Sequence, residues 1–376
     1  MTTFFLCRCL PILIRYVGKI FKHLLNSILL KRFTMSSANV VESKRSCTVI
    51  GTHNGNFHCD EILACFMLQN LPKYKDSKII RTRDLKLLDS CNIVVDVGGV
   101  YDHQKNRYDH HQRSFSETFN SLNPKKPWTT KLSSAGLIYY HFGREVIASI
   151  LGNESSKEEV EAIYDKVYER FVEEVDGIDN GINAYDGEPR FHITTNLSSR
   201  VGSLNPSWND KNPDSDANFY KAMDMIGSEF VDKVKYYYNS WLPAKVVVET
   251  ALKNRFQVDP SGEIMEFTDG GGCPWRDHLF NLEQDLNIDP IIKFILFTDQ
   301  TGSWRVQGVP PVLGSFDLRV PLAEKWRGLR DEDLSEKSGI ADCIFCHASG
   351  FIGGNKTRAG VLEMAKKSLE FAKIKA

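Results

Sequence analysis

The sequence predicts an α/β protein: a doubly wound, mainly parallel sheet followed by a second, smaller α/β domain. Short apolar runs alternate with amphipathic segments between residues 47 and 97, as in βαβ units. Carboxylate and imidazole side chains follow the ends of two of these runs. The carboxyl ends of parallel strands are where such sheets bind their ligands. A chain of 376 residues with 42% hydrophobic and 25% charged side chains can bury a sizeable core and is long enough for two domains.

The first domain has a regular series of expected elements. Apolar runs predict strands at 48–50, 78–82 and 92–97, with helices between them at 60–71 and 85–89. The polar stretch 101–113 is expected to form a hairpin or loop over the sheet edge. Further expected elements are helices at 133–151 and 157–175, a loop at 203–216, and a long helix from 217 to about 248 that Pro243 kinks or splits.

The chain changes character from about residue 255. Glycine-rich connections, DGGGCPW, TGSW and SGFIGGNKT, separate short apolar runs. The expected strands are 264–268, 291–297, 304–307 and 344–347, and the expected helices are 275–283 and 359–372. This pattern predicts a second α/β unit.

Residues 1–41 have the form of a mitochondrial targeting presequence. They contain no Asp or Glu, and Arg15, Lys19 and Lys22 share one face of a helix whose other face is apolar. The charges that interrupt the span 10–30 argue against a membrane anchor, so no stable membrane insertion is expected. A shorter product starting at Met35 would remain in the cytosol or nucleus. The predicted organisation is a presequence at 1–41, the first α/β domain with a helical linker at 42–250, and the second domain at 251–376.

Charge and cysteine content narrow the class of protein. The formal net charge of −1 gives no bulk attraction to nucleic acid, although a local basic groove would be enough to bind it. Nine cysteines at irregular spacing indicate reduced thiols in the cytosol, nucleus or mitochondrial matrix. The segment Cys343-Ile344-Phe345-Cys346-His347 matches a haem-attachment pattern, but a buried strand explains it better, and no second ligand pair is spaced for zinc.

A metal site is predicted at the carboxyl edge of the first sheet. Its candidate ligands are His53, His58, Asp60, Asp96, His110 and either Asp176 or Asp179. Two divalent ions about 4 Å apart, bridged by an Asp, could activate a water and stabilise a pentavalent phosphorus. Mixed imidazole and carboxylate ligation favours manganese over magnesium.

The motif Asp109-His110-His111 resembles the signature of the DHH phosphoesterases, which include RecJ-type exonucleases, oligonucleotide hydrolases and manganese pyrophosphatases. From about Cys47 to the end, the chain resembles more closely the melanocyte proliferating gene (Myg) family of metal-dependent 3′–5′ RNA exonucleases of mitochondria and nucleus. The blocks that carry this resemblance are THNGNFHCDE, VDVGG, YDHHQ, EEVDGIDNG, GSFDLRVPLAEKWRGLRDEDL and HASGFIGGNKTRAG.

The resemblance implies a role for each residue of the site. His53, His58 and Asp60 match the first metal-binding motif, with His58 at a place more often held by Asp. Asp96 matches the second motif and is the expected bridging carboxylate. His110 would bind metal, His111 would face the substrate phosphate, and Asp109 would orient the pair. The fourth motif supplies one metal-binding Asp; Asp176 and Asp179 both qualify, with Asp176 slightly preferred.

The second domain resembles the substrate-holding domain that accompanies DHH. Ser349-Gly350 and Gly353-Gly354 precede a helix, so their amides and its dipole are expected to hold a phosphate, with Lys356 and Arg358 adding charge.

The function expected from residues and resemblance together is that of a metal-dependent 3′–5′ RNA exonuclease. One alternative is a hydrolase of short oligonucleotides, cyclic dinucleotides or pyrophosphate, which chain-length dependence would distinguish. Another is a non-catalytic RNA-binding or regulatory protein, which would bind RNA tightly without turnover.

Overall fold

The computed structural model describes residues 48–152, 155–268 and 271–375. The predicted presequence at 1–41 and the start at Met35 lie outside these residues. Two five-stranded sheets are present, one formed by residues 49–108 and the other by residues 264–355. Among the described residues, no helix is both long enough and apolar enough to span a membrane.

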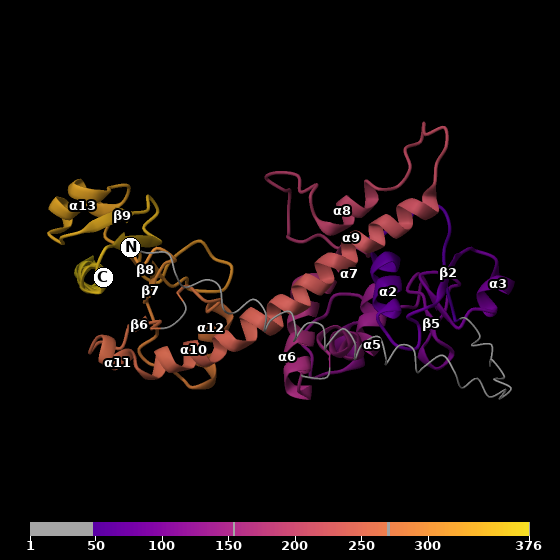
Figure 1. Cartoon of the computed structure of the whole chain (residues 1–376), viewed down its shortest axis with the longest axis horizontal. Helices are drawn as coiled ribbons and strands as arrows, with labels where there is room; N and C mark the ends of the chain where they lie inside the picture. Colours follow the sequence, from indigo (N-terminus) through magenta and orange to yellow (C-terminus); the bar gives the residue numbers. More distant parts are fainter. Residues whose placement is uncertain (1–47, 153–154, 269–270, 376) are drawn as a thin grey trace, which may run out of the picture. The chain divides into compact units, whose positions relative to one another are not determined.

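The first sheet is mainly parallel, and the predicted fold class is confirmed (Figure 1). Its strand order is β2-β1-β3-β5-β4, in which only the pairing of β5 with β4 is antiparallel. The strands are β1 Val49–Thr52, β2 Lys78–Arg81, β3 Ile93–Val95, β4 Tyr101–Asp102 and β5 Arg107–Tyr108. The chain leaves β1 for β2 on one side and then crosses to β3 on the other. The carboxyl ends of β1 and β3 therefore form a topological switch point, where ligands bind in such sheets.

Side chains alternate between the two faces of the sheet along each strand, and both faces are covered. Ile93 and Val95 of β3 belong to the large core beneath helices α2 and α5. Val94, between them, packs with Leu88 and Cys91 at the end of the short helix α3. The helices that surround the sheet are α2 Cys59–Gln69, α3 Leu85–Asp89, the short 3-10 helix η2 His103–Lys105, α4 Phe119–Leu122 and α5 Ser134–Leu151.

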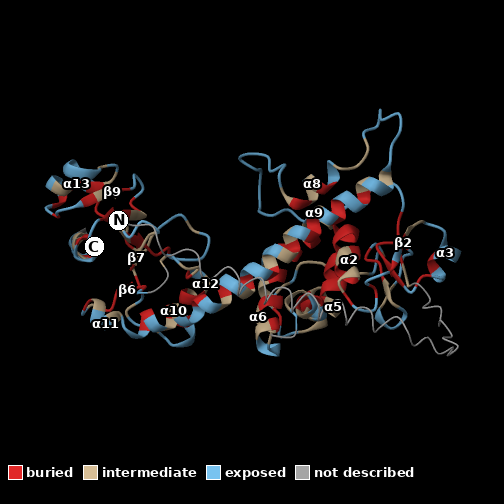
Figure 2. Ribbon diagram, viewed as in Figure 1, coloured by how far each residue is buried: buried red, intermediate tan, exposed pale blue. Residues whose placement is uncertain are grey.

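The remaining helices of the first part are interrupted by π-helical turns. The expected single helix at 157–175 is α6 Lys157–Val167, the π-turn η3 Tyr168–Val172 and α7 Glu173–Asp179, which continues through Gly177. The long expected helix is α9 Ser215–Tyr236, the π-turn η4 Tyr237–Trp241 and α10 Leu242–Lys253, with the short α8 Leu197–Gly202 preceding it. Pro243 is the second residue of α10, just after the π-turn, and because the backbone of Trp241 and Leu242 is α-helical, the chain remains helical from α9 into α10. Figure 2 shows α2 buried along almost its whole length and α9 buried on one face.

The second sheet is mainly antiparallel, in the order β6-β7-β8-β10-β9 with only β6 and β7 parallel. Its strands are β6 Ile264–Glu266, β7 Phe294–Thr298, β8 Trp304–Gly308, β9 Cys343–Cys346 and β10 Ile352–Asn355. The helices are α11 Arg255–Val258, α12 Arg276–Asp285, η5 Glu324–Trp326, α13 Asp331–Ser338 and α14 Arg358–Lys375. Two apolar clusters separate from the first core lie around this sheet. Cys343 and Cys346 are buried in strand β9, as the strand interpretation of the C-x-x-C-H segment predicts.

Strand β10 corrects the expectation that Gly353 and Gly354 lie in a loop before a helix. Both glycines pair with β8 on one side and β9 on the other. A Cβ at Gly353 would come within 2.8 Å of Met364 Cε and one at Gly354 within 2.7 Å of Arg305 Nη1, so a larger residue at either position would require these side chains to move. The glycines therefore permit close packing of a central strand, and the low strand propensity of glycine hid this strand from sequence analysis.

Candidate metal centre

Three neighbouring parallel strands deliver the candidate ligands. His53 follows β1, Asp96 follows β3, and Asp109-His110-His111 follows β5. Helix α2 contributes Asp60 and Glu61 from its first turn. Asp96 has a φ of 57°, a left-handed conformation that is uncommon for a residue other than glycine and that turns its carboxylate at the end of the strand.

The structure brings most of the predicted ligands together. Side-chain ligand atoms lie within 4.8 Å of one another in three overlapping groups. These groups are His53, His58, Glu61 and Asp96; Asp96, His110 and His111; and Asp60, His110 and Asp179. Because Asp96 belongs to two of the groups, it occupies the place expected of a bridging carboxylate.

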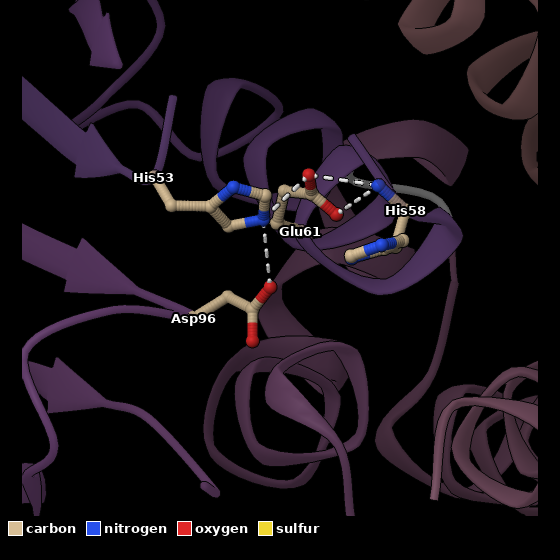
Figure 3. A group of neighbouring side chains, drawn as sticks. All are labelled: His53, His58, Glu61 and Asp96. Atoms are coloured by element: carbon tan, nitrogen blue, oxygen red, sulfur yellow. Dashed lines mark hydrogen bonds and ion pairs between the residues drawn. The ribbon is translucent and has the colours of Figure 1, made fainter. Parts of the chain in front are cut away.

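His53 is oriented with one nitrogen toward this cluster (Figure 3). Its Nε2 atom lies 3.0 Å from Glu61 and 3.2 Å from Asp96, while Nδ1 lies 3.1 Å from the carbonyl oxygen of Asn54. A backbone carbonyl on one ring nitrogen is the usual means of directing the other toward a metal. His58 is exposed, and Glu61 accepts a hydrogen bond from its backbone N–H.

His110 connects the remaining carboxylates. Its Nε2 atom lies 3.0 Å from Asp179, 3.4 Å from Asp96 and 3.8 Å from Asp60. His110, Asp60 and Asp96 are buried, and the Asp179 side chain is 17% exposed. The cluster therefore places several carboxyl groups close together in a region with little exposure to solvent.

Burial and neighbouring charges shift the pKa values of the groups in the cluster. Burial opposes the charge on both imidazoles, yet their carboxylate neighbours raise the pKa of His53 to about 10 and that of His110 to about 9. Burial also raises the pKa of the Asp60 carboxyl, and the nearby carboxylates of Asp96 and Asp179 raise it further. Although burial works against it, the two imidazoles lower the pKa of Asp96. Protons on the two imidazoles therefore compensate the carboxylates, and a bound divalent cation would take their place.

Unsatisfied polar atoms provide the test of fit for a metal. Within the described part of the chain, the carboxylate oxygens of Asp60 and the Nδ1 atom of His110 have no hydrogen-bond partner, whereas His110 Nε2 faces Asp179 at 3.0 Å. Buried polar atoms without partners are costly unless a ligand satisfies them. Imidazole together with carboxylate is a donor set for manganese, zinc or iron, so these residues fit a divalent metal.

Hydrogen bonds to the Asp109 carboxylate hold the DHH motif in place. Asp109 accepts from the backbone N–H of Gly99 at 2.6 Å and, through its other oxygen, lies 2.8 Å from His111 Nδ1. The side chain of His111 is 64% exposed. Asp109 thus orients a histidine that faces solvent beside the buried cluster.

Asp176, the slightly preferred candidate of the fourth motif, lies outside the cluster. Its carboxylate accepts hydrogen bonds from Ser133 N–H and Oγ at 2.9 and 2.7 Å, from Gly136 N–H at 3.0 Å and from Tyr168 at 3.0 Å. These contacts cap the amino-terminal end of α5. Burial raises the pKa of Asp176 to about 7. The geometry favours Asp179 as the ligand, contrary to the sequence preference.

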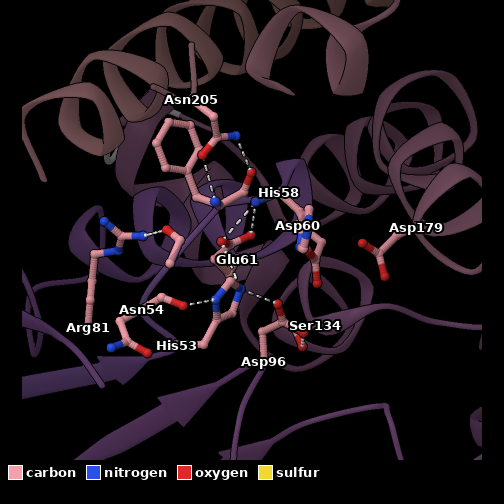
Figure 4. Close-up of polar contacts among 12 residues, drawn as sticks. His53, Asn54, His58, Asp60, Glu61, Arg81, Asp96, Ser134, Asp179 and Asn205 are labelled. Atoms are coloured by element: carbon pink, nitrogen blue, oxygen red, sulfur yellow. Dashed lines mark hydrogen bonds and ion pairs between the residues drawn. The ribbon is translucent and has the colours of Figure 1, made fainter. Parts of the chain in front are cut away.

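Beyond the ligands assigned above, three further residues contribute to the site. Glu61 joins the His53 group, and its position beside Asp60 at the start of α2 was the available signal. Arg81 and Asn205 hold the segment from His53 to His58 in place (Figure 4).

Arg81 and Asn205 act through the backbone. Arg81 donates to the carbonyl of Gly55 at 2.5 Å and to Asp216 at 2.9 Å. Asn205 accepts from Phe57 N–H at 2.9 Å and donates to Phe57 O at 2.8 Å, across 148 residues of sequence. No pattern in the sequence around Arg81 or around Asn205 indicates these long-range contacts.

The predicted phosphate cradle is not arranged as expected. The N–H of Ser349 donates to His347 Nδ1 and that of Gly350 to His347 O, while Gly353 and Gly354 belong to β10. Lys356 N–H donates to Asp342 O, and the Arg358 guanidinium pairs with Glu266 at 2.7 Å. The amides of Ser349, Gly350 and Lys356 are therefore already used within the fold.

Comparison with known proteins places the chain in a family. Residues 49–369 match the model MYG1_exonuc, described as "Uncharacterised protein family (UPF0160)". MYG1 exonuclease of Bos taurus is 58% identical over 85% of this chain and 84% of its own length, and that of Homo sapiens is 57% identical over 85% of each. The MYG1 protein of Saccharomyces cerevisiae is 46% identical over 87% of this chain and 96% of its own.

One solved structure, an exopolyphosphatase-related protein from Bacteroides fragilis, covers 88% of this chain and 93% of its own at 12% identity. Its TM-score of 0.20 is too low to support any conclusion. The sequence relatives and the family match, by contrast, confirm the resemblance read from the six blocks, and the chain belongs to the MYG1 family.

Proposed function

We propose that this chain is a metal-dependent 3′–5′ RNA exonuclease that acts in RNA processing in mitochondria and, from a start at Met35, in the nucleus or cytosol. The observation that carries the proposal is the buried cluster of His53, Asp60, Asp96, His110 and Asp179 at the switch point of the sheet. Relatives named exonuclease at 57–58% identity support hydrolysis of a phosphodiester in nucleic acid.

Two divalent ions, manganese before magnesium, would be held by His53, His58, Asp60, Asp96, His110 and Asp179, and Asp96 belongs to two of the ligand groups. When bound, such ions lower the pKa of a water nucleophile and neutralise charge on the phosphoryl oxygens. Asp96 is suited to the shared position because its two oxygens face different partners, Oδ2 toward His53 and Oδ1 toward His110. Glu61 lies 3.0 Å from the same Nε2 atom of His53.

The chain's own groups then orient the substrate. Asp109 raises the pKa of His111 by accepting its hydrogen bond, although burial opposes this, so His111 can present a proton to a phosphate oxygen. Ser134 Oγ donates to Tyr108 O at 2.9 Å and lies 3.3 Å from Asp96 Oδ1. Hydrolysis consumes one water, leaves a shortened RNA with a 3′-hydroxyl and releases a nucleoside 5′-monophosphate.

The test uses RNA labelled at its 5′ end and the chain from Met35 onward. Manganese, magnesium and chelator are compared, beside an Asp96→Ala, His110→Ala double variant. We expect a ladder that shortens from the 3′ end, requires metal and is absent in the variant.

Other outcomes would assign a different function. Preference for short oligonucleotides, cyclic dinucleotides or pyrophosphate over long RNA would assign the small-substrate hydrolase. Tight RNA binding without turnover in any metal would assign the non-catalytic protein. A reporter fused to residues 1–41 tests location, and a cytosolic reporter would contradict mitochondrial import.

A further inference from the structure

A hollow of about 350 Å³ opens directly beside the DHH motif. Its walls are formed by Gly99, Val100, Tyr101, Gln112, Ser114, Phe115 and Glu117. We call it the Glu117 hollow. None of these residues was assigned to the site from the sequence, and none belongs to the metal-ligand groups.

The Glu117 hollow is held in fixed register with the DHH motif. Gln112 Nε2 donates to the backbone carbonyl of Asp109 at 2.9 Å, and Gly99 N–H donates to the Asp109 carboxylate at 2.6 Å. The ring of Phe115 lies 6.3 Å from that of His110, edge to face. A molecule in the hollow would therefore lie next to a phosphate that contacts His111 and His110.

The chemistry of the walls selects the kind of group that fits. Tyr101 and Phe115 pack edge to face at 5.6 Å and form an apolar side. Glu117 is the one charged residue among the lining residues, and Ser121 Oγ donates to one of its oxygens at 2.6 Å, which fixes the carboxylate. Lys131 Nζ lies 5.6 Å from the ring of Phe115 but is not among the lining residues. A carboxylate as the charged group of the lining repels phosphate and favours a neutral group with hydroxyl donors.

We propose that the Glu117 hollow binds the 3′-terminal ribose of the RNA, and that Glu117 accepts hydrogen bonds from its 2′- and 3′-hydroxyls. The inference rests on the proposed 3′–5′ exonuclease function and deepens it by naming the end group that is selected. A carboxylate that accepts from ribose hydroxyls is the means by which dinucleotide-binding folds recognise this sugar. A 2′-deoxyribose would leave part of the carboxylate unpaired, and a 3′-phosphate would place like charges together.

The experiment measures hydrolysis and binding separately in the full-length protein. Three RNAs of the same sequence end in a ribose with a free 3′-hydroxyl, in a 2′-deoxyribose, or in a ribose 3′-phosphate. Binding in manganese is measured by calorimetry with adenosine 5′-monophosphate and with its 2′-deoxy analogue. Glu117→Gln is the test variant, and Glu145→Gln, an exposed position on α5, is the matched control.

We expect the wild type and Glu145→Gln to prefer the ribose end over the deoxyribose end by about tenfold in kcat/KM, the value of one hydrogen bond to a charged group. Both should bind adenosine 5′-monophosphate more tightly than its 2′-deoxy analogue by a similar factor. Glu117→Gln should reduce both ratios below about threefold and should cleave the 3′-phosphate RNA faster, relative to the ribose end, than the wild type does.

The hydrolysis and binding measurements test the ribose site separately from the proposed exonuclease function on which it rests. Metal-dependent hydrolysis with equal rates on ribose and deoxyribose ends would overturn the role of Glu117 and leave the exonuclease in place. Discrimination that persists in Glu117→Gln would also overturn it. Selective, Glu117-dependent binding of the ribonucleotide without any hydrolysis would overturn the exonuclease and retain the ribose site.

Discussion

At the scale of single residues, the two aspartates of α7 have opposite tasks. Asp179 lies 3.0 Å from His110 within the ligand cluster, whereas Asp176 accepts three hydrogen bonds at the start of α5 and one from Tyr168. They are three residues apart in one helix, and both are acidic. Only their surroundings distinguish a candidate ligand from a helix cap.

Exchange of each aspartate for asparagine should therefore separate activity from stability. Asp179→Asn should weaken manganese binding by about 10- to 100-fold with little change in the free energy of unfolding, because it removes a charged ligand from a partly exposed position. Asp176→Asn should lower the free energy of unfolding by about 1–3 kcal/mol, because its neutral amide oxygen accepts the three hydrogen bonds of α5 less strongly than a carboxylate, and its N–H₂ replaces the oxygen that accepts from Tyr168. Metal titration and urea unfolding of both variants measure this. The reverse pattern would restore Asp176 as the ligand.

At the scale of elements, the segment from His53 to His58 depends on anchors from distant parts of the chain. The Arg81 side chain, 7% exposed, joins Gly55 to the first turn of α9. Asn205, in the loop after α8, pairs with both backbone groups of Phe57. The position of two candidate ligands is thus set by residues that touch neither of them.

Arg81→Ala and Asn205→Ala should act on metal affinity more than on turnover. Loss of either anchor should weaken manganese binding by about tenfold, and saturating manganese should restore most of kcat, because the ligands remain but are less well placed. Arg83→Ala, at an exposed neighbouring position, is the control. Rates measured across a manganese series decide this, and a kcat loss that saturating metal does not restore would assign these residues a direct role in the reaction.

Helices α5 and α6 are linked by an ion-pair network with a predictable pH dependence. Arg144 donates two hydrogen bonds to Glu161 and, together with Lys126, lowers the pKa of that carboxyl from 4.5 to about 2 in spite of partial burial. Because the folded pKa is below the unfolded value, the network stabilises the protein above about pH 4.5, and this contribution is lost as the pH falls toward 2.

Glu161→Gln should accordingly lower the free energy of unfolding by about 1 kcal/mol at pH 7, a value limited by the exposure of Glu161 and Arg144. The difference between variant and wild type should shrink between pH 5 and pH 3. Urea unfolding at several pH values measures it, with Glu145→Gln, at an exposed position on α5, as the control. A constant difference across this range would mean that the network does not titrate.

At the scale of the whole molecule, the elements with a clear hydrophobic pattern were predictable from the sequence. The strands before His53 and Asp96 are short apolar runs, and the parallel sheet brings their ends together as expected. Strand β10 was missed because glycine lacks strand propensity and only packing against β8 and β9 explains it. Asp179 could not be chosen over Asp176, because the π-turn before α7 and the cap of α5 are tertiary features that local sequence does not determine.

The metal centre should also affect the stability of the protein as a whole. The cluster joins three strand ends and helices α2 and α7, so an ion bound there contacts elements from residue 53 to residue 179. An ion that binds the folded chain alone raises the free energy of unfolding by about 2.7 kcal/mol at a hundred times its dissociation constant. Manganese should therefore raise the thermal midpoint of the wild type in a concentration-dependent way, and chelator should reverse the change.

The Asp96→Ala, His110→Ala double variant provides the decisive comparison for this prediction. It removes the carboxylate shared between two ligand groups and the imidazole shared between two. Its midpoint should no longer respond to manganese, even if the apo variant is itself more stable because a repulsive buried carboxylate is gone. An equal manganese response in wild type and double variant would place the stabilising ion elsewhere, and the cluster would then be a network of buried ion pairs rather than a metal centre.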